Sequence, residues 1–531
     1  MRLPDFRVVA RFISPAARRR QKLRKSWGCV GDGDGWLATR LFDLRRADNP
    51  RALDDKTWRD LELASFFHQL DTTITKPGSQ YLYNQLRTLE SDSDAPVGRY
   101  ATCRLLVRDA RLREELQLAL RRLEVDSAAY IVELVFGPPP FGLRYPRLLH
   151  AWALCCLASL ALMVPLGAWW VLPVILGVNA FVLYRIPSKL RRDTEGLIEG
   201  PRLLAVADRL ASIEPHDSIP QLVSLKGERR RRSRLRRQLR WLAILSDSVT
   251  VWGGLAVAAN WLCLAQLVVY SRSVHRFMES RHEWASIFEL VASVDAAIAV
   301  ANFLHRTPVH CPATVANEPT LAISEGYHPL IVHPVPNSIT LTGRSALITG
   351  SNMTGKTTYM KMVGVNIVLG HTLGFCLARS ATLPRSAVMA SVRSDQSVES
   401  GKSGYSAEVE AIGEFVKRAA AGKCRIFILD EPFRGTNTVE RIAVAKAVLD
   451  ALSADAQVLA TTHDVELQQL LTDRFDFFYF REDPDVNGFF DFKVRVGTSR
   501  ERNAIRVLGR MGFPSTIVSA ALTQLEKLPQ P

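Results

Sequence analysis

A glycine-rich loop at residues 350–357 has the residue types and spacing of a phosphate-binding loop. Its letters, GSNMTGKT, fit the pattern Gly-x4-Gly-Lys-Ser/Thr at every fixed position, between the apolar run 346–348 and a helical pattern. In such a loop, consecutive backbone N–H groups surround phosphate oxygens, and the N-terminal end of the following helix adds positive potential. The sequence therefore predicts a nucleotide phosphate site at the junction of a strand and a helix.

Each residue of this loop has an expected role in holding ATP with Mg²⁺. Lys356 would reach the β- and γ-phosphates, and the Thr357 hydroxyl would bind Mg²⁺. The other residues expected to contact the nucleotide, mainly through backbone N–H groups, are Gly350, Ser351, Asn352, Met353, Thr354, Gly355 and Thr358. We therefore expect ATP and Mg²⁺ as cofactors.

Two later apolar runs end in residues that complete the chemistry of ATP hydrolysis. Residues 425–429 read RIFIL and are followed by Asp430, placed to hold Mg²⁺ through water, and Glu431, placed to orient or deprotonate the attacking water. The alternative is a core strand with an acidic end. The run 457–460 leads to His463, a position typical of the γ-phosphate sensor in ATPases that work as head-to-tail pairs.

Four segments within about 120 residues resemble the MutS family of DNA mismatch repair ATPases. They read GSNMTGKTTYMK from Gly350, SGYSAEVE from Ser403, DEPFRGTNT from Asp430 and TTHD from Thr461. The resemblance implies that Ser403 contacts the γ-phosphate of the nucleotide held by the other subunit, so that catalysis would involve Glu431, His463 and Ser403. It also implies a head-to-tail homodimer with Asn337 near the adenine.

The resemblance extends more loosely over residues 53–526 and has limits. Ser351 and Thr354 stand where the family usually has a proline and a glycine, and Asp464 replaces an aromatic residue. The resemblance starts near Leu53, so we expect the mismatch-reading and connector domains of the family to be missing from this chain.

The charge balance favours acidic partners. The net charge is +15 and the pI about 9.6, which suits nucleic acid or an anionic membrane surface. Residues 228–240 contain eight arginines; this run is either a solvated helix face or a contact to DNA phosphates or anionic lipid. The eight cysteines form no Cys-x-x-Cys pair, so we expect reduced cysteines and no zinc site.

One stretch of about 37 residues, 148–184, contains no Asp, Glu, Lys or Arg. A single helix of that length would be roughly 55 Å long, against a bilayer core of about 30 Å, so two short spans turning at residues 165–167 fit better. Basic residues on both sides would keep both ends in the cytoplasm. The alternatives are a buried hairpin of a soluble core and a shallow re-entrant hairpin.

A second uncharged stretch, residues 248–270, is long enough to span a membrane. One further crossing would put Lys356 on the opposite side of the membrane from the N-terminus, whereas ATP is cytosolic. We therefore expect a buried or membrane-lying helix here, with an additional span as the alternative. The expected location of the protein is the cytoplasmic (inner) membrane, with the ATPase domain in the cytoplasm.

Together these features predict an α plus α/β protein with three parts. Residues 1–52 are expected to be a basic tail and linker, and residues 53–320 a helical MutS-like core interrupted by the transmembrane hairpin. Residues 321–531 are expected to form a P-loop (ABC-type) ATPase domain with C-terminal dimerisation helices. Asp295, in an apolar helical stretch of the core, is expected to serve helix packing or capping rather than catalysis.

The expected function is that of a membrane-tethered MutS-like ATPase that binds DNA. Its role would lie in DNA mismatch repair or recombination-related processing, on duplex DNA that is structured or branched. The alternative is a membrane-based ABC-type mechanochemical ATPase that acts on a protein or lipid partner without DNA.

Overall fold

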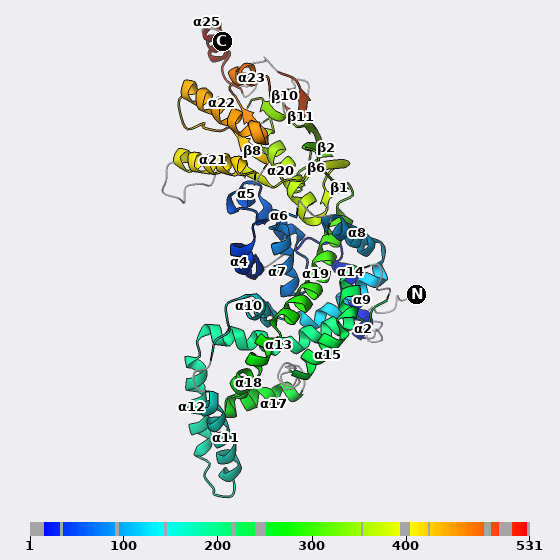
Figure 1. Cartoon of the computed structure of the whole chain (residues 1–531), viewed down its shortest axis with the longest axis vertical. Coiled ribbons are helices and arrows are strands. Elements are labelled where there is room, and N and C mark those ends of the chain that lie inside the picture. The colour runs from blue at the N-terminus through cyan, green and yellow to red at the C-terminus, as the bar shows by residue number, and fades with distance from the viewer. Residues whose placement is uncertain are drawn as a thin grey trace, which may run out of the picture. The chain divides into compact units, whose positions relative to one another are not determined.

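A computed structural model of the chain describes residues 15–31, 35–90, 95–142, 146–214, 219–238, 251–351, 354–392, 404–422, 425–482, 490–498 and 512–527 (Figure 1). The chain divides into two units, each built from several segments. Unit 1 comprises Met1–Pro50, His68–Gln85 and Ala101–Arg306, and unit 2 comprises Arg51–Phe67, Leu86–Tyr100 and Thr307–Pro531. Residues 53–67 and 86–100, which we expected in the helical core, therefore belong to the unit that carries the glycine-rich loop.

In its described residues, the regular secondary structure of unit 1 consists of helices. The long helix α19 (Arg281–Arg306) contacts α9, α10, α13 and α14, and buries Trp284, Ile287 and Phe288 completely. The helices of this unit, two of which (α7, α8) run on into unit 2, are α2 (Pro15–Ser26), α3 (Gly35–Ala38), α4 (Arg40–Arg45), α7 (Lys76–Leu86), α8 (Ala95–Arg108), α9 (Ala110–Leu120), α10 (Ile131–Phe136), α11 (Pro146–Met163), α12 (Val171–Arg185), α13 (Ser188–Leu210), α14 (Pro220–Gly227), α15 (Arg229–Gln238), α17 (Val251–Cys263), α18 (Ala265–Glu279) and α19.

Within residues 1–52, which we expected to be a tail and linker, the described residues 15–31 and 35–52 include three α-helices, α2, α3 and α4. Leu41 and Phe42 of α4 are buried, and α4 packs against α10. The backbone N–H of Gly28 donates to the side chain of Asn302 in α19 at 2.6 Å. The helices α3 and α4 are too short to show a helical repeat, which explains why the sequence pattern did not reveal them.

A buried carboxylate fixes the loop that precedes α7. Asp295 of α19 is fully buried and accepts hydrogen bonds from the backbone N–H groups of Ile74 (3.0 Å) and Thr75 (2.8 Å) and from the Thr75 hydroxyl (2.7 Å). A Cβ atom on Gly78 would lie 2.3 Å from a carboxylate oxygen of Asp295, so only glycine fits there. Asp295 thus joins α19 to the loop that leads into α7, in agreement with the packing or capping role that we expected.

The helices α11 and α12 form a hairpin, and both pack against α17, while α11 also packs against α18 (Figure 1). Asn179 is fully buried among these helices, where it accepts from Trp152 Nε1 at 2.9 Å and donates to the backbone oxygen of Trp261 at 2.8 Å. Large apolar side chains instead lie exposed on the hairpin: Leu148, Leu154, Leu157, Leu162, Val164, Leu166, Trp169, Trp170, Val174, Val178, Phe181 and Tyr184.

Length and composition alone give only weak support for a membrane span. Among the described residues, α19 is long and apolar enough to cross a bilayer, but 78% of its apolar window is buried, as in a core helix. The helices α12 and α13 are also long and apolar enough when they are taken together as one span, although they meet at a bend of 101°. The helix α11 is apolar but short. The hairpin at 148–184 exists as a pair of helices, and its insertion into a membrane stays a prediction.

Unit 2 contains two sheets. The first has the strand order β3-β2-β6-β1-β5, and the second has the order β11-β10-β4-β9-β8-β7. The second sheet is parallel from β10 to β7, and only β11 runs antiparallel to its neighbour. The strands are β1 (Cys311–Ala316), β2 (Thr320–Gly326), β3 (Asn337–Thr342), β4 (Ser345–Thr349), β5 (Phe375–Cys376), β6 (Ser380–Pro384), β7 (Val388–Ser391), β8 (Ile426–Asp430), β9 (Gln457–Thr462), β10 (Phe475–Glu482) and β11 (Phe490–Val496).

The helix α20 (Lys356–Leu373) contacts strands of both sheets and is buried along most of its length. The central strands β4, β8 and β9 are buried at every position, which explains their continuous apolar runs in the sequence. The remaining helices that lie wholly or partly in this unit are α5 (Asp55–Asp60), α6 (Leu63–Leu70), α21 (Gly404–Ala420), α22 (Thr438–Asp455), α23 (Glu466–Leu470) and α25 (Ser515–Lys527).

The N-terminal helix α5 covers the edge strand β7 of the second sheet. The Thr57 hydroxyl accepts a hydrogen bond from the backbone N–H of Ala390, and the Asp60 carboxylate accepts one from Val392, both at 2.9 Å. Burial raises the pKa of Asp60, which Lys56 partly offsets. Backbone N–H groups at the edge of β7 thus donate hydrogen bonds to side chains of a segment more than 300 residues earlier in the chain.

Candidate nucleotide site

The glycine-rich loop lies where the sequence predicts it, between the central strand β4 and the helix α20. Gly350 and Gly355 have φ angles of 150° and 98°, in the region that favours glycine. Between them, the buried Thr354 donates from its hydroxyl to the backbone oxygen of Ser351 at 2.8 Å. The loop therefore sits at the carboxyl end of parallel strands, where α/β proteins bind ligands.

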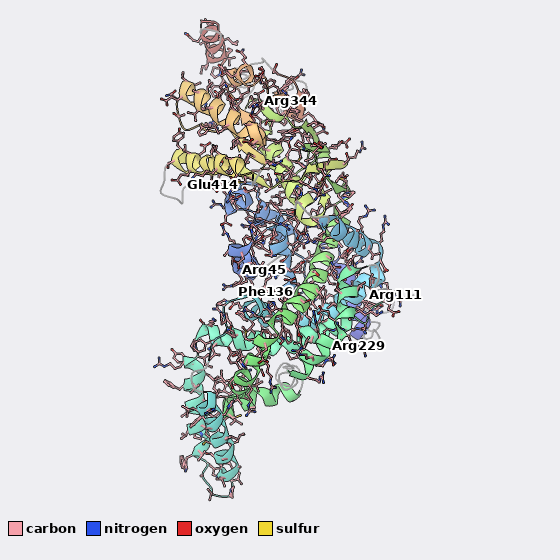
Figure 2. All side chains as sticks on the ribbon, viewed as in Figure 1. Arg45, Arg111, Phe136, Arg229, Arg344 and Glu414 are labelled. Carbon is pink, nitrogen blue, oxygen red and sulfur yellow. The ribbon has the colours of Figure 1, made fainter. Side chains whose placement is uncertain are left out.

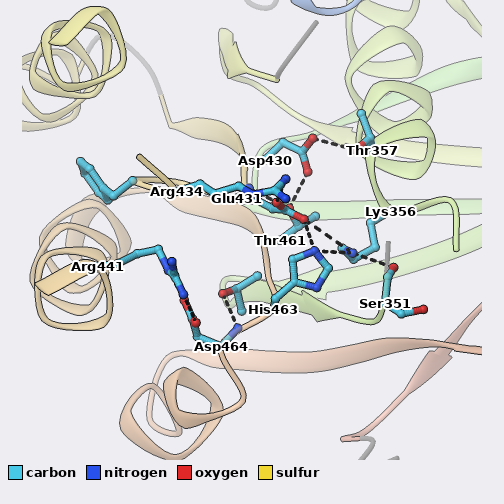
Figure 3. Close-up of polar contacts among 12 residues, drawn as sticks. Ser351, Lys356, Thr357, Asp430, Glu431, Arg434, Arg441, Thr461, His463 and Asp464 are labelled. Carbon is cyan, nitrogen blue, oxygen red and sulfur yellow. Dashed lines mark hydrogen bonds and ion pairs between the residues drawn. The ribbon is translucent and has the colours of Figure 1, made fainter. Parts of the chain in front are cut away.

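Lys356 is only 5% exposed and points back into the loop (Figure 3). Its Nζ donates to the backbone oxygens of Gly350 (2.8 Å) and Ser351 (2.9 Å), and it lies 3.7 Å from the Glu431 carboxylate. It is also 3.4 Å from Nε2 of His463. Burial lowers the pKa of Lys356, while the nearby carboxylates counteract this effect. The ammonium group is thus held where it can exchange these oxygens for phosphate oxygens.

Oxygen donors suited to Mg²⁺ lie beside the start of α20 (Figure 3). The Thr357 hydroxyl donates to one carboxylate oxygen of Asp430 at 2.8 Å, and the Thr461 hydroxyl donates to the other at 2.5 Å. Thr461 Oγ1 also accepts from the backbone N–H of Glu431 at 2.9 Å. The residues present therefore fit a magnesium ion bound with nucleotide phosphates, through Thr357 and Asp430. Thr461 orients this pair, a role that sequence reasoning missed although the residue directly follows the third apolar run.

Glu431 lies among three basic side chains (Figure 3). It forms ion pairs with His463, with Arg434 at 2.9 Å and with Lys356. Burial alone would raise the pKa of Glu431, but these partners outweigh burial and lower the pKa to about 2. Its backbone is in the left-handed region, with φ of 49°. The carboxylate is consequently ionised and, in this arrangement, a weak base.

Asp464, which departs from the family pattern, holds the segment that carries His463. Its carboxylate binds Arg441 of α22 in a bidentate ion pair, at 2.8 Å and 2.6 Å, and its backbone N–H donates to Thr462 Oγ1 at 3.0 Å. This pairing fixes the turn after β9 against α22 and so positions the His463 ring toward Glu431.

A cavity of about 370 Å³ opens beside the loop and has a mainly apolar wall. Asn337 lines it, but its side chain binds backbone groups of β11: it donates to Phe492 O at 2.9 Å and accepts from Val494 N at 2.8 Å. Burial lowers the pKa of His328 to about 4, so this histidine is neutral at physiological pH. The lining residues that the sequence did not predict as site residues include Tyr327, His328, Ile331, His333, Val335 and Met362.

The structure therefore brings together five of the predicted site residues: Lys356, Thr357, Asp430, Glu431 and His463. Thr358 and Asn337 line the adjoining cavity. Asn352, Met353 and Ser403 lie outside the described residues, so their expected roles stay predictions.

Comparison with known proteins gives one family match, the model of MutS domain V over residues 346–529. Among curated proteins, the chain is 31% identical over 220 residues to the DNA mismatch repair protein MutS of Aquifex pyrophilus, covering 39% of this chain and 26% of that protein. It is 27% identical over 272 residues to the protein of the same name from Streptococcus equi subsp. equi, covering 48% and 32%. A third relative, the DNA mismatch repair protein MSH3 of Phaeosphaeria nodorum, is 27% identical over 256 residues, covering 45% and 22%. The matched part is thus a third or less of each relative.

Proposed function

Because this chain belongs to the MutS family, we propose that it is a MutS-like ATPase that binds DNA and acts in mismatch repair or recombination-related DNA processing. The observation that carries the proposal is the set of contacts joining Lys356 to Glu431 and His463, and Thr357 to Asp430, at the end of a glycine-rich loop. This arrangement has the parts that ATP hydrolysis needs.

Hydrolysis in this site depends on how Glu431 is released from its partners. Lys356 would bind the β- and γ-phosphates and leave the carboxylate, while Thr357 and Asp430 hold Mg²⁺, which neutralises phosphate charge when bound. Glu431 would then face a water molecule and accept its proton, with His463 beside the γ-phosphate. Ser403 of a second copy, arranged head to tail, would complete the site, so we propose a homodimer as the active form.

The proposal that DNA is the substrate rests on the relatives, which are named as DNA mismatch repair proteins, and on the net charge of +15. Its test is DNA binding by detergent-solubilised Glu431→Gln protein on intact, mismatched and four-way duplexes, with and without ATP. We expect ATP-dependent binding that prefers a structured or branched duplex. The affinity should fall steeply with salt, because phosphate contacts release counterions.

The unaltered protein and a Lys356→Ala variant are the controls for this measurement, since the latter should not respond to ATP. Equal binding to every duplex, unaffected by ATP, would contradict the proposal. That result would favour the second candidate function, a membrane-based ATPase that acts on a protein or lipid partner. The outward apolar side chains of α11 and α12 are the observation that keeps this candidate open.

We further propose that the hairpin of α11 and α12 tethers the protein to the cytoplasmic membrane, with the ATPase domain in the cytoplasm. In the bundle with α17, apolar side chains are exposed and the polar Asn179 is inside, which is the reverse of the usual order in water. Trp169 and Trp170, 62% and 69% exposed at the turn of the hairpin, suit a bilayer interface.

The hairpin proposal predicts that vesicle binding depends on the apolar turn. Replacing Leu166, Trp169 and Trp170 with aspartate should reduce flotation with phosphatidylcholine vesicles at high salt by at least about 10-fold, because burying charge in hydrocarbon is costly. A matched control replaces three exposed valines of unit 2 with aspartate: Val332, Val439 and Val496. Equal flotation of the turn variant and this control would contradict a membrane tether.

A further inference from the structure

The arginine-rich helix α15 is fixed to unit 1 by one face only. Leu235 is fully buried and Arg232 is 4% exposed, and Arg232 donates to Asp208 of α13 at 2.8 Å. Arg236 pairs with the same carboxylate, and Arg234 lies 3.4 Å from the carboxylate of Glu283. These contacts determine which side chains of α15 face outward.

Three arginines of α15 lie on its outward face. Arg229, Arg230 and Arg237 are exposed, and none of them is within ion-pair distance of a carboxylate in the part of the chain that the structure describes. Lys226, at the end of α14, is exposed beside them. Figure 2 shows the side chain of Arg229 at the outer margin of unit 1. The run of arginines thus divides into a docked half and a solvated, strongly basic half.

The direction of α13 determines the height at which this basic face lies along the axis of the hairpin. Helices α12 and α13 meet at a bend of 101°, so α13 runs across the axis of the hairpin rather than along it. Asp208 lies about 30 Å along α13 from its start at Ser188, at 1.5 Å per residue. Because α15 packs on this part of α13, it stands to the side of the hairpin, near the level of its base.

Other basic side chains also lie near the base of the hairpin. Arg147 and Arg185 are exposed at the two chain ends of the hairpin, and Arg191 is exposed in the first turn of α13. If the hairpin is inserted in a bilayer, these residues lie where the lipid headgroups begin. The helix α17, which follows α15 in the chain, also packs against both hairpin helices.

We infer that the outward face of α15, together with Lys226, binds the headgroups of anionic phospholipids in the membrane that holds the hairpin. The inference rests on the proposed membrane tether and adds a lipid preference to it. Basic side chains near an anionic bilayer surface each strengthen binding by roughly five-fold. A lipid surface is favoured over DNA for this face because the basic residues are spread along one level across the hairpin base.

The test compares vesicles of pure phosphatidylcholine with vesicles containing about one third phosphatidylglycerol. The full-length triple variant Arg229→Gln, Arg230→Gln, Arg237→Gln should lose about 10- to 100-fold of the extra affinity for anionic vesicles at low salt. Its binding to neutral vesicles should match that of the unaltered protein. The charge-matched control changes three other exposed arginines of unit 1 to glutamine: Arg20, Arg108 and Arg122.

The outcomes separate this inference from the membrane tether itself. The inference is overturned, while the tether stands, if the triple variant keeps the full preference for anionic vesicles. It is also overturned if the control variant loses as much affinity for anionic vesicles as the triple variant does. If the unaltered protein binds neither type of vesicle at high salt, the tether fails. If the triple variant loses duplex DNA binding but keeps its lipid preference, the face serves DNA and the inference is overturned in favour of that partner.

Discussion

The Glu431→Gln variant is expected to lower the kcat of ATP hydrolysis by about 10²- to 10⁴-fold, the usual contribution of a positioned general base. Glutamine keeps the size and hydrogen-bonding shape of the side chain but cannot accept a proton from water. ATP binding should persist, because Lys356 and the glycine-rich loop remain. Steady-state release of phosphate and equilibrium binding of a fluorescent ATP analogue measure the two effects separately.

The pH dependence provides a second readout for the same carboxylate. Because the basic partners of Glu431 lower its pKa to about 2, its carboxylate stays ionised in the free protein at pH 5 and above. The kcat/KM for ATP, which reports the groups of the free protein, should therefore show no acid limb from Glu431 between about pH 5 and pH 8. The control is Asp450→Asn, which removes an exposed carboxylate of α22 that pairs with Lys446. A Glu431→Gln protein with near-normal kcat would remove this residue from the chemistry.

The Asp295→Ala variant is expected to destabilise unit 1 by about 3–5 kcal/mol, since it leaves two buried donors of Thr75 and the half-buried N–H of Ile74 without their acceptor. Gly78→Ala should also destabilise it, because the new methyl group would collide with the Asp295 carboxylate. Hydrogen exchange in peptides that cover residues 68–85 and 281–306 reports the stability of this unit directly.

Asp295 should also make stability depend on pH in an unusual direction. Burial is the main cause that raises its pKa, from 3.8 to about 6, so the folded state binds a proton that the unfolded state releases. Between pH 4 and pH 6 the free energy of unfolding should fall by about 3 kcal/mol as pH rises, and above pH 6 this contribution should stay constant. Asp295→Asn should abolish that change, whereas Ser293→Ala on the same helix should keep it. A pH response equal in all three proteins would contradict the assignment.

The sequence predicted which side chains lie together at the glycine-rich loop, because the chemistry of a phosphate site constrains residue spacing. The glycine-rich loop is one continuous motif, and the strands before Asp430 and His463 are strongly apolar. Parallel strands bring their carboxyl ends to one edge of the sheet. The contact between Thr357 and Asp430 follows from that geometry. Thr461 and Arg441 were missed because their importance comes from hydrogen bonds across strands and helices, which a single sequence does not display.

The division of the chain into units was harder to predict for the same reason. Segments 51–67 and 86–100 have ordinary amphipathic patterns, and only their long-range contacts assign them to unit 2. The helices α3 and α4 are too short for a periodic signal to stand out from a linker. For residues 148–184, apolar composition predicted the two helices correctly, but composition cannot say whether lipid or protein covers them.

The contact of α5 with strand β7 has a consequence for how the protein is made. Thr57 and Ala390 are 333 residues apart in the chain, and a ribosome adds roughly 5–20 residues per second. The buried side of α5 therefore leaves the ribosome roughly 15–70 s before its strand is synthesised. During that interval the segments of unit 1 are completed, whereas unit 2 has to wait until β7 and the later strands of its second sheet are synthesised.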